Sequence, residues 1–332
     1  MLIESQATKL ASGLERSDRK KVQKAFLIYN PASGRRKAKR AEAIARVIET
    51  FRAAGVEVEA AATTHAGSAI QQAREGANAG YDTVIACGGD GTVNEALNGL
   101  VAASATAALG VVPLGSGNLL ASDLGLPFDP VAAAQRLLSY TPRDFRPGMV
   151  TSLRNGAQEK RCFLVAAGVG SDAELMYRTA VEAKERWGRN AYFLEMARMA
   201  MRGGYPSFKI EWEDEQGSRR QDRATLAMAI RATRFPGLLR LVNLGTALTR
   251  DSFCLLLFRT AKVRRFLSYF AGVASGINWK VKDVEVVHSR WLRCAPLAET
   301  RDPIHSQADG ELLGTLPVEL GIEDRPVKLL MP

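Results

Sequence analysis

A glycine-rich turn with a central aspartate is the first place where residue types and spacing suggest chemistry. The run Gly88-Gly89-Asp90-Gly91-Thr92-Val93-Asn94-Glu95 follows an apolar stretch and opens a helical pattern. Three glycines in four positions let the backbone turn sharply and bring its N–H groups close to a bulky anion. The N-terminal end of the following helix adds positive partial charge, so the run predicts a phosphate site.

Asp90 narrows the kind of phosphate compound that this turn would bind. A carboxylate repels phosphate unless a cation lies between them, so the aspartate suggests Mg²⁺ and, with it, a nucleoside triphosphate. A tight turn in which Asp90 caps the helix accounts for the same residue. The local sequence leaves both interpretations open.

Two further glycine loops follow strand-like runs. Gly115-Ser116-Gly117-Asn118 comes after the next apolar run, and Asn30-Pro31-Ala32-Ser33-Gly34-Arg35 comes after the first. Carboxyl ends of parallel strands are where open α/β sheets bind ligands, so we expect the three loops to meet at one edge. Arg35 is placed to meet a phosphate or a carboxylate, although its basic surroundings also suit a solvated helix start.

A pair of carboxylates stands near the other end of the chain, in Ala308-Asp309-Gly310-Glu311. Two residues apart in a strand, Asp309 and Glu311 project to the same side, where one can take a proton while the other organises cations. Asp-Gly is also the commonest hairpin pair, and a plain turn is the simpler explanation when this segment is taken alone.

The elements that position these residues alternate between strand and helix in the first half of the chain. Strands are predicted over residues 25–29, 56–58, 83–87 and 108–112, and helices over residues 37–54, 68–79 and 93–102. Such alternation implies a mostly parallel sheet with helices on both faces. At 332 residues the chain is long enough for two domains.

Strand-like runs dominate beyond about residue 145 and predict a second, β-rich domain. Helical inserts interrupt it around residues 173–201 and 262–276, and the closing run 316–331 is typical of two strands paired with each other. The polar, charge-rich residues 1–24 are predicted to be an appended tail.

Charge and composition restrict the partners. Lys and Arg total 45 against 35 Asp and Glu, which favours nucleotide phosphates, an anionic membrane or nucleic acid. Aromatic residues are 7% of the chain and are not interleaved with basic ones, which argues against nucleic acid. The four cysteines lack metal-ligand spacing and predict buried free thiols in a reducing compartment.

Hydrophobic segments argue for a cytoplasmic protein with at most peripheral membrane contact. No stretch reaches the ~18 apolar residues of a membrane span, and the first residues lack the basic and apolar regions of a secretion signal. Residues 262–277 mix basic and aromatic side chains, which suits docking on an anionic bilayer. Packing of one face of a helix against the core explains the same pattern.

Taken together, the motifs resemble the diacylglycerol kinase catalytic-domain family, over about residues 25–332. The markers are Tyr29-Asn30-Pro31 with Ser33-Gly34, Gly88 to Glu95 with Asn98-Gly99, Leu109 to Asn118, and Asp309-Gly310-Glu311. The resemblance implies an N-terminal α/β nucleotide-binding domain over residues 25–146, completed by residues 318–332, and a β-rich, sandwich-like lipid-binding domain over residues 147–317. ATP would lie in the cleft between them and give its γ-phosphate to a lipid hydroxyl.

The resemblance also implies roles for individual residues. Asp309 would be the general base, Glu311 would complete the charge network, and Asp90 would be linked to Mg²⁺. The nucleotide would lie over the glycine loops. Its further contacts would be Asn30, Pro31, Ser33, Gly34, Arg35, Thr64, Thr92, Asn94 and Glu95.

A structural Mg²⁺ and a homodimer are further implications of the resemblance. The candidate metal ligands are the Asp251 carboxylate and the carbonyls of Leu248 and Phe253. The chain departs from the family's pattern here, because residues 231–239 replace an Asn-Gly-x-x-x-Gly-Gly segment and Ser252 stands where glycine is expected.

Two other functions compete with a lipid kinase. An NAD kinase also uses Gly-Gly-Asp-Gly-Thr, but the loop at residues 113–118 is closer to that of the lipid kinases. A non-catalytic lipid-binding protein on the same fold is the second alternative. The sequence leaves the acceptor open among diacylglycerol, a sphingoid base, a monoacylglycerol, phosphatidylglycerol and a polyprenol.

Overall fold

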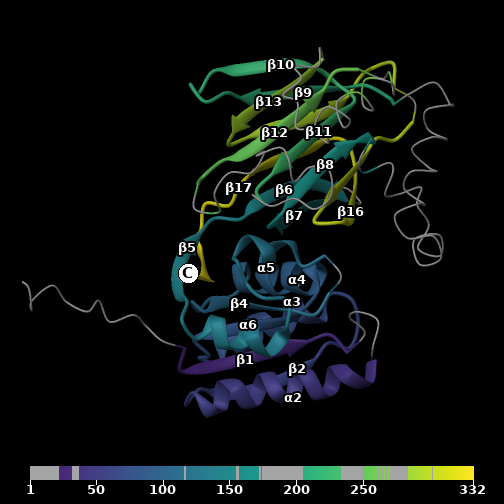
Figure 1. Cartoon of the computed structure of the whole chain (residues 1–332). Coiled ribbons are helices and arrows are strands. Elements are labelled where there is room, and N and C mark those ends of the chain that lie inside the picture. The colour runs from purple at the N-terminus through teal and green to yellow at the C-terminus, as the bar shows by residue number, and fades with distance from the viewer. Residues whose placement is uncertain are drawn as a thin grey trace, which may run out of the picture.

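The chain folds into an α/β domain and a β-rich domain that are stacked on each other (Figure 1). The computed structural model describes residues 22–31, 37–115, 117–154, 157–171, 173, 205–232, 248, 250–260, 262, 265, 268, 283–300 and 302–332. The fold class predicted from the sequence, an N-terminal α/β domain followed by a β-rich domain, is confirmed. Most of the predicted tail and both predicted helical inserts lie outside the described residues.

The first domain is built on a six-stranded sheet with the order β2-β1-β3-β4-β18-β5. Its strands are β1 Lys24–Tyr29, β2 Glu57–Ala62, β3 Thr83–Gly88, β4 Ala108–Pro113, β5 Thr141–Phe145 and β18 Val327–Met331. Every residue of the central strands β3 and β4 is buried, as expected for a parallel sheet covered on both faces. Only β5, at the edge, runs antiparallel to its neighbour.

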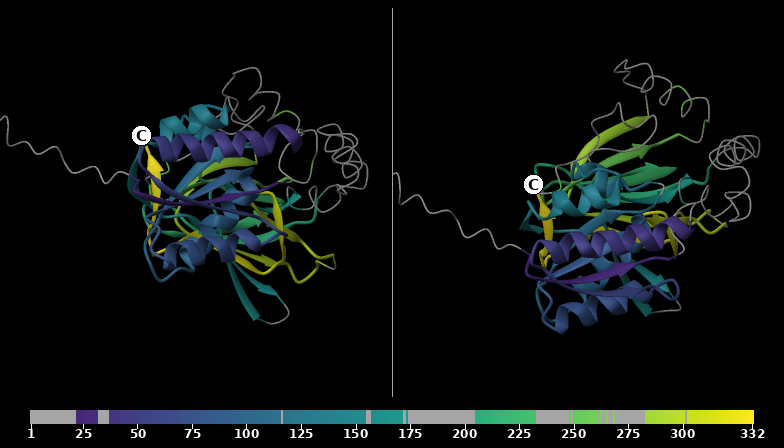
Figure 2. Two further views of the ribbon diagram at one scale, coloured as in Figure 1. Left: turned by 90° about the horizontal axis from the view of Figure 1, so that it is seen from below. Right: turned by 60° about the horizontal axis from the view of Figure 1, so that its bottom comes forward.

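Five helices cover the two faces of this sheet. They are α2 Lys37–Ala53, α3 Ser68–Asn78, α4 Asp90–Val101, α5 Leu119–Asp123 and α6 Pro130–Leu137. Seen from below, α2 lies across the sheet on the side away from the second domain (Figure 2). On the opposite side, α4 and α5 lie between the sheet and the β-rich domain (Figure 1). The helix that begins at the glycine turn is therefore at the domain junction.

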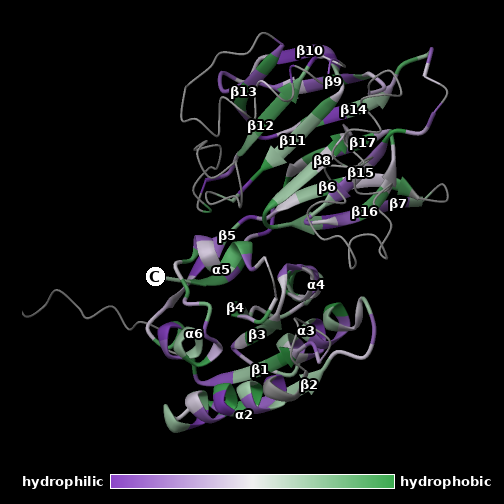
Figure 3. Ribbon diagram, turned by 45° about the vertical axis from the view of Figure 1, so that its right-hand side comes forward, coloured by the Kyte–Doolittle hydropathy of each residue, from purple (hydrophilic) through white to green (hydrophobic). Residues whose placement is uncertain are grey.

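The second domain is a sandwich of two six-stranded sheets with the orders β10-β9-β14-β17-β6-β7 and β13-β12-β11-β8-β15-β16. The strands are β6 Gly148–Arg154, β7 Ala157–Phe163, β8 Ala166–Gly170, β9 Phe208–Glu213, β10 Arg219–Ala224, β11 Leu226–Ile230, β12 Phe253–Phe258, β13 Val284–Ser289, β14 Leu292–Pro296, β15 His305–Ala308, β16 Glu311–Thr315 and β17 Val318–Ile322. Apolar side chains from both sheets form one core. The edge strand β10 is charged and hydrophilic (Figure 3), which protects an exposed edge from pairing with another chain.

The closing strands differ from the sequence-based prediction. β17 pairs with β6 and β14 in the sandwich, whereas β18 crosses to the first domain and inserts between β4 and β5. The prediction that residues 316–331 pair with each other is therefore wrong. The predicted domain boundary at residue 318 is also wrong, because only β18 completes the α/β sheet. None of the helices in the described ranges is long and apolar enough to span a membrane.

Gly99 provides a test of how α3 and α4 pack. A Cβ atom at this position would lie 2.2 Å from the Ile70 carbonyl oxygen, which belongs to the backbone of α3. We expect Gly99→Ala to lower the free energy of unfolding by about 3 kcal/mol, because the helices would have to separate. Urea unfolding measures the change. The control is Gly321→Ala, whose new Cβ meets the nearest atom at an ordinary 3.8 Å. Equal stability of the two variants would contradict the close helix contact.

Candidate active site

The two glycine loops at the carboxyl ends of β3 and β4 touch through their backbones. A Cβ atom on Gly115 would lie 2.5 Å from the Cα of Gly89, so no larger residue fits without moving one loop. Asn118 closes the second loop, because its side chain accepts a hydrogen bond from the Gly115 N–H at 2.9 Å and donates one to the Gly115 carbonyl at 2.8 Å. These two loops therefore meet at one edge of the sheet, as the sequence predicted.

Asp90 joins the same two loops. It is the first residue of α4, and its Oδ1 accepts a hydrogen bond from the Leu119 N–H at 2.7 Å. A Cβ on Gly117 would lie 2.7 Å from its Oδ2, so the carboxylate is held closely against the second loop. Burial raises the pKa of Asp90 above the usual aspartate value, and backbone N–H groups around residues 118–120 oppose that shift. The carboxylate thus fixes the loop geometry in addition to any role toward a cation.

A hollow of about 350 Å³ opens beside the glycine turn. It is lined by Asn30, Pro31, Thr63, Thr64, His65, Ala66, Gly91, Thr92 and Glu95. Residues from the first loop, from the end of β2 and from the start of α4 therefore share one wall. His65 and Ala66 are lining residues that the sequence motifs did not identify.

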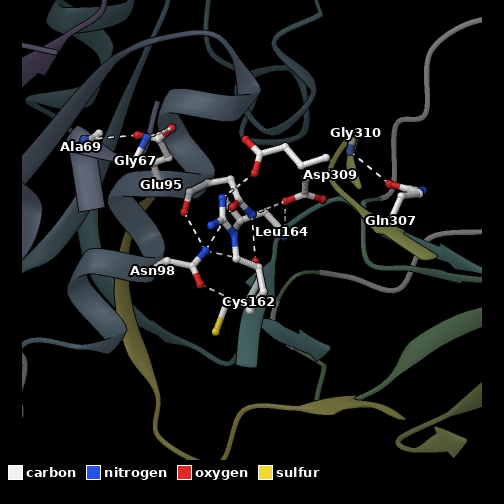
Figure 4. Close-up of polar contacts among 12 residues, drawn as sticks. Gly67, Ala69, Glu95, Asn98, Cys162, Leu164, Gln307, Asp309 and Gly310 are labelled. Atoms are coloured by element: carbon white, nitrogen blue, oxygen red, sulfur yellow. Dashed lines mark hydrogen bonds and ion pairs between the residues drawn. The ribbon is translucent and has the colours of Figure 1, made fainter. Parts of the chain in front are cut away.

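Glu95 lines this hollow but is already engaged. Its Oε1 accepts a hydrogen bond from the Gly67 N–H at 2.8 Å, and its Oε2 accepts one from the Ala69 N–H at 3.2 Å (Figure 4). These amides lie at the start of α3, so the carboxylate anchors that helix against α4. We therefore expect Glu95 to influence a nucleotide by holding this wall of the hollow in place.

Asp309 lies in the turn after β15 with its carboxylate in a cradle of N–H donors. Its φ of 48° is in the left-handed region, which is uncommon for a residue other than glycine. Oδ1 accepts hydrogen bonds from the N–H groups of Val165 and Ala166 at 2.8 and 3.0 Å. Oδ2 accepts them from the Leu164 N–H at 2.7 Å, drawn in Figure 4, and from the Asn94 side chain at 2.8 Å.

Two opposing effects act on the acidity of Asp309. Burial is the larger and raises its pKa above the usual aspartate value, because a charged carboxylate loses hydration there. The N–H donors of the cradle and of Asn94 lower the pKa, since they stabilise the ionised form. The result is a carboxylate that takes a proton more readily than an exposed aspartate.

Helix α4 connects the glycine turn to Asp309. Its Asn94 side chain donates to Asp309 and also to the Cys162 carbonyl at 2.9 Å. One turn later, Asn98 donates to the same carbonyl at 3.1 Å and accepts from the Cys162 N–H at 2.8 Å (Figure 4). Because Cys162 belongs to β7, these amides fasten the start of α4 to the second domain.

Glu311 faces the glycine turn from the second domain. Its Oε1 lies 3.8 Å from where a Cβ on Gly91 would be. Its Oε2 is 2.5 Å from the Arg161 guanidinium on β7. The Asp309-Gly310-Glu311 segment of the second domain therefore lies beside the phosphate-site candidate of the first domain, with the Arg161 guanidinium next to Glu311.

Several known proteins that are similar to this chain are described as diacylglycerol kinases. The "Diacylglycerol kinase catalytic domain" family matches residues 24–150. The diacylglycerol kinase of Bacillus subtilis is 29% identical over 313 residues, which cover 94% of this chain and 97% of that protein. The diacylglycerol kinase of Staphylococcus saprophyticus is 31% identical over 192 residues, which cover 58% of this chain and 60% of that protein. The chain is thus similar to diacylglycerol kinases over nearly its whole length, and its first domain matches their catalytic-domain family.

Solved structures show the same fold over nearly the whole length. A putative diacylglycerol kinase from Bacillus anthracis superposes with a TM-score of 0.74, covering 96% of this chain and 98% of that one, at 19% identity. The similarity to named diacylglycerol kinases supports an enzyme of the lipid kinase class.

Some residues expected at the lipid kinase site lie elsewhere or outside the described part. Ser33, Gly34, Arg35 and Ser116 are not among the described residues. Asp251, Leu248 and Phe253 lie next to the linker that leads into β6, and Asp251 forms an ion pair with Arg146 at 3.3 Å. Among the described residues, no three His, Cys, Asp or Glu side chains come together as a metal site.

Arg161 and the bridging role of Asn98 were missed by the sequence motifs. Asn98 was a family marker without an assigned role, and its partner Cys162 is 64 residues away. Arg161 is 150 residues from Glu311 and stands in a strand whose polar residues carry no local signal. Asn98 meets Cys162 across the domain junction, whereas Arg161 meets Glu311 within the second domain, and only tertiary packing brings either pair together.

Proposed function

We propose that the protein transfers the γ-phosphate of ATP to a hydroxyl group of a lipid, with a diacylglycerol-like molecule as the acceptor. The observation that carries the proposal is the Asn94 side chain, which hydrogen-bonds Asp309 from a helix that starts at the glycine turn. One rigid element thereby connects the candidate phosphate site to the candidate base. The names of the relatives from Bacillus and Staphylococcus support the choice of acceptor.

The nucleotide would lie over residues 88–92 and 115–118. Backbone N–H groups at the start of α4 point out of the turn and, with the helix dipole, favour phosphate there. The hollow beside Asn30 and Thr64 would take the nucleoside. Preorganised donors of this kind supply most of the catalysis of phosphoryl transfer, because they neutralise charge without reorganising.

Magnesium would reach the site together with the triphosphate. Mg²⁺ is commonly held by one or two carboxylates plus substrate phosphates, and Asp90 and Glu311 are carboxylates beside the two glycine loops. Their hard oxygen donors fit this ion. It would supply charge neutralisation at the phosphates.

Asp309 would accept the proton of the lipid hydroxyl. Its carboxylate now receives four N–H donors, which fill its acceptor positions. Three of the donors are backbone groups held beside β8 and the fourth is the Asn94 side chain, so the hydroxyl would have to take the place of the Asn94 hydrogen bond. Peripheral contact with an anionic membrane, favoured by the net charge of +10, would bring the lipid to Asp309.

A radiolabel transfer assay tests the proposal. The protein is incubated with γ-³²P-ATP and Mg²⁺ in mixed micelles containing diacylglycerol, monoacylglycerol, a sphingoid base, phosphatidylglycerol or a polyprenol, and with NAD in a separate reaction. We expect solvent-extractable label with a diacylglycerol-like lipid. Label in NAD without label in any lipid would replace the proposal by a nucleotide kinase.

The hydrogen bond from Asn94 has a measurable consequence for pH dependence. This bond lowers the pKa of Asp309, so Asn94→Ala is expected to raise that pKa. A base must be deprotonated to work, and the acid limb of kcat/KM should therefore move to higher pH. The control is Asn98→Ala, which removes contacts to Cys162 and to the Asn94 Oδ1 but keeps the N–H donor of Asn94 that faces Asp309. An acid limb that stays in place in Asn94→Ala would argue against Asp309 as the base.

A further inference from the structure

The side chain of Arg231 is fully buried at the end of β11, with 0% of its surface exposed. Its Nη1 donates to the carbonyl oxygens of Arg250 and Ser252, both at 2.5 Å. Its Nη2 donates to the carbonyl oxygens of Arg146 at 2.6 Å and Leu248 at 3.2 Å. Four backbone carbonyls thus converge on one cation inside the protein.

These carbonyls belong to segments that the cation holds together. Arg146 lies in the linker between β5 of the first domain and β6 of the second, and residues 248–252 precede β12. The backbone of Arg231 also donates to the Val165 carbonyl at 2.8 Å, and the Val165 N–H in turn donates to Asp309. Arg231 therefore holds the domain linker through its guanidinium and the segment that cradles Asp309 through its backbone N–H.

Converging carbonyl oxygens beside a carboxylate are the ligands that a hard divalent cation takes. The Leu248 carbonyl and Asp251 were predicted to hold Mg²⁺, and the geometry does not fit that ion. The Leu248 carbonyl is used by Arg231, and the guanidinium carbon lies 5.4 Å from the centre of the Phe145 ring. Asp251 is 46% exposed and pairs with Arg146. A divalent ion among these carbonyls would also be repelled by the buried guanidinium.

We infer that Arg231 replaces a structural divalent cation in this chain, so that a covalently attached charge holds the domain junction. The guanidinium meets the carbonyls with four N–H donors in a fixed plane, which a lysine could not reproduce. Burial lowers the pKa of Arg231 to about 10, while the nearby Asp251 acts in the opposite direction. The side chain remains charged at neutral pH, and the junction does not depend on the supply of metal.

Thermal unfolding of the nucleotide-free protein tests this inference without reference to catalysis. The wild-type protein is melted in EDTA, in Mg²⁺ and in Ca²⁺, and we expect the three Tm values to agree within about 1 °C, because an ion without a native-state site adds no linkage stabilisation. Arg231→Met should lower Tm by roughly 10 °C, since it leaves buried carbonyls without donors. The control is Arg220→Met, which removes an exposed arginine paired with Asp214 and should change Tm by about 1 °C or less.

The variant Asp251→Asn distinguishes Arg231 from a divalent ion as the cation that holds the junction. With Arg231 as the cation, this change removes only an exposed ion pair, and Tm stays insensitive to Mg²⁺ and Ca²⁺. The inference is overturned if wild-type Tm rises by several degrees with either ion and Asp251→Asn loses that response. It is equally overturned if Arg231→Met has the same Tm as the wild type. Should Arg231→Met fail to fold, calorimetric titration of Mg²⁺ and Ca²⁺ into the nucleotide-free wild type decides, with no binding expected.

Discussion

Changing Asp309 to asparagine is expected to lower the kcat of lipid phosphorylation by about 10²–10⁴-fold, the contribution typical of a positioned general base. The affinity for ATP should change little, because the nucleotide would contact the glycine loops of the other domain. Turnover and ATP binding are measured on the same preparation. Asp324→Asn is the matched control, since this aspartate is exposed. An Asp309→Asn enzyme with wild-type turnover would remove Asp309 from the mechanism.

The pH profile provides an independent reading of the same residue. Burial raises the pKa of Asp309, so protonation should inactivate the wild-type enzyme at a higher pH than the usual aspartate value implies. The acid limb of kcat/KM should accordingly lie above that value and be absent from the residual activity of Asp309→Asn. Because the new amide group would face N–H donors, some loss of stability is also expected. Unfolding curves separate that loss from the loss of turnover.

Changing Asp90 to alanine is expected to weaken the binding of Mg²⁺·ATP by about 100-fold or more, the loss expected when a charged group with several interactions is removed. Both proposed roles of the carboxylate act in this direction, because it would meet Mg²⁺ and it holds the second glycine loop through Leu119. Calorimetry with and without Mg²⁺ distinguishes the roles. Loss confined to the Mg²⁺ complex would indicate contact with the ion, and equal loss in both would indicate loop geometry.

The control for this variant is Asp129→Ala. Asp129 also accepts a backbone N–H at the start of a helix, from Ala132 at 2.8 Å, but it lies at α6. Its removal should cost about 1 kcal/mol of stability and leave nucleotide affinity unchanged. Unchanged Mg²⁺·ATP affinity in Asp90→Ala would refute the assignment of the nucleotide to this turn.

The features that could be predicted from the sequence are those with local signals. The buried strands β3 and β4 are short apolar runs, and the glycine loops follow them directly, so both could be located without the structure. The destination of β18 was expected from the family resemblance and has no local signal, since β17 and β18 have similar apolar patterns and only tertiary pairing sends them to different sheets. Helix α6 was also missed, although Asp129 and Pro130 are a recognisable helix start.

At the site, the residue types were predictable and their partners were not. Asp309 was identified from its motif, but its cradle comes from residues 164–166 and from Asn94, far along the chain. For the candidate metal ligands too, the residues could be named from the sequence but the group that they contact could not. The Leu248 carbonyl was expected to meet Mg²⁺, yet it accepts from the guanidinium of Arg231, which follows β11 and which no local pattern connects to residue 248.

A crystal structure with Mg²⁺ and a non-hydrolysable ATP analogue is the most direct measurement of the proposed site. We predict that the triphosphate lies over residues 88–92 and 115–118, with the γ-phosphate directed toward Asp309 and Glu311. A nucleotide bound away from the glycine turn, or bound there with its γ-phosphate directed away from the second domain, would contradict the account.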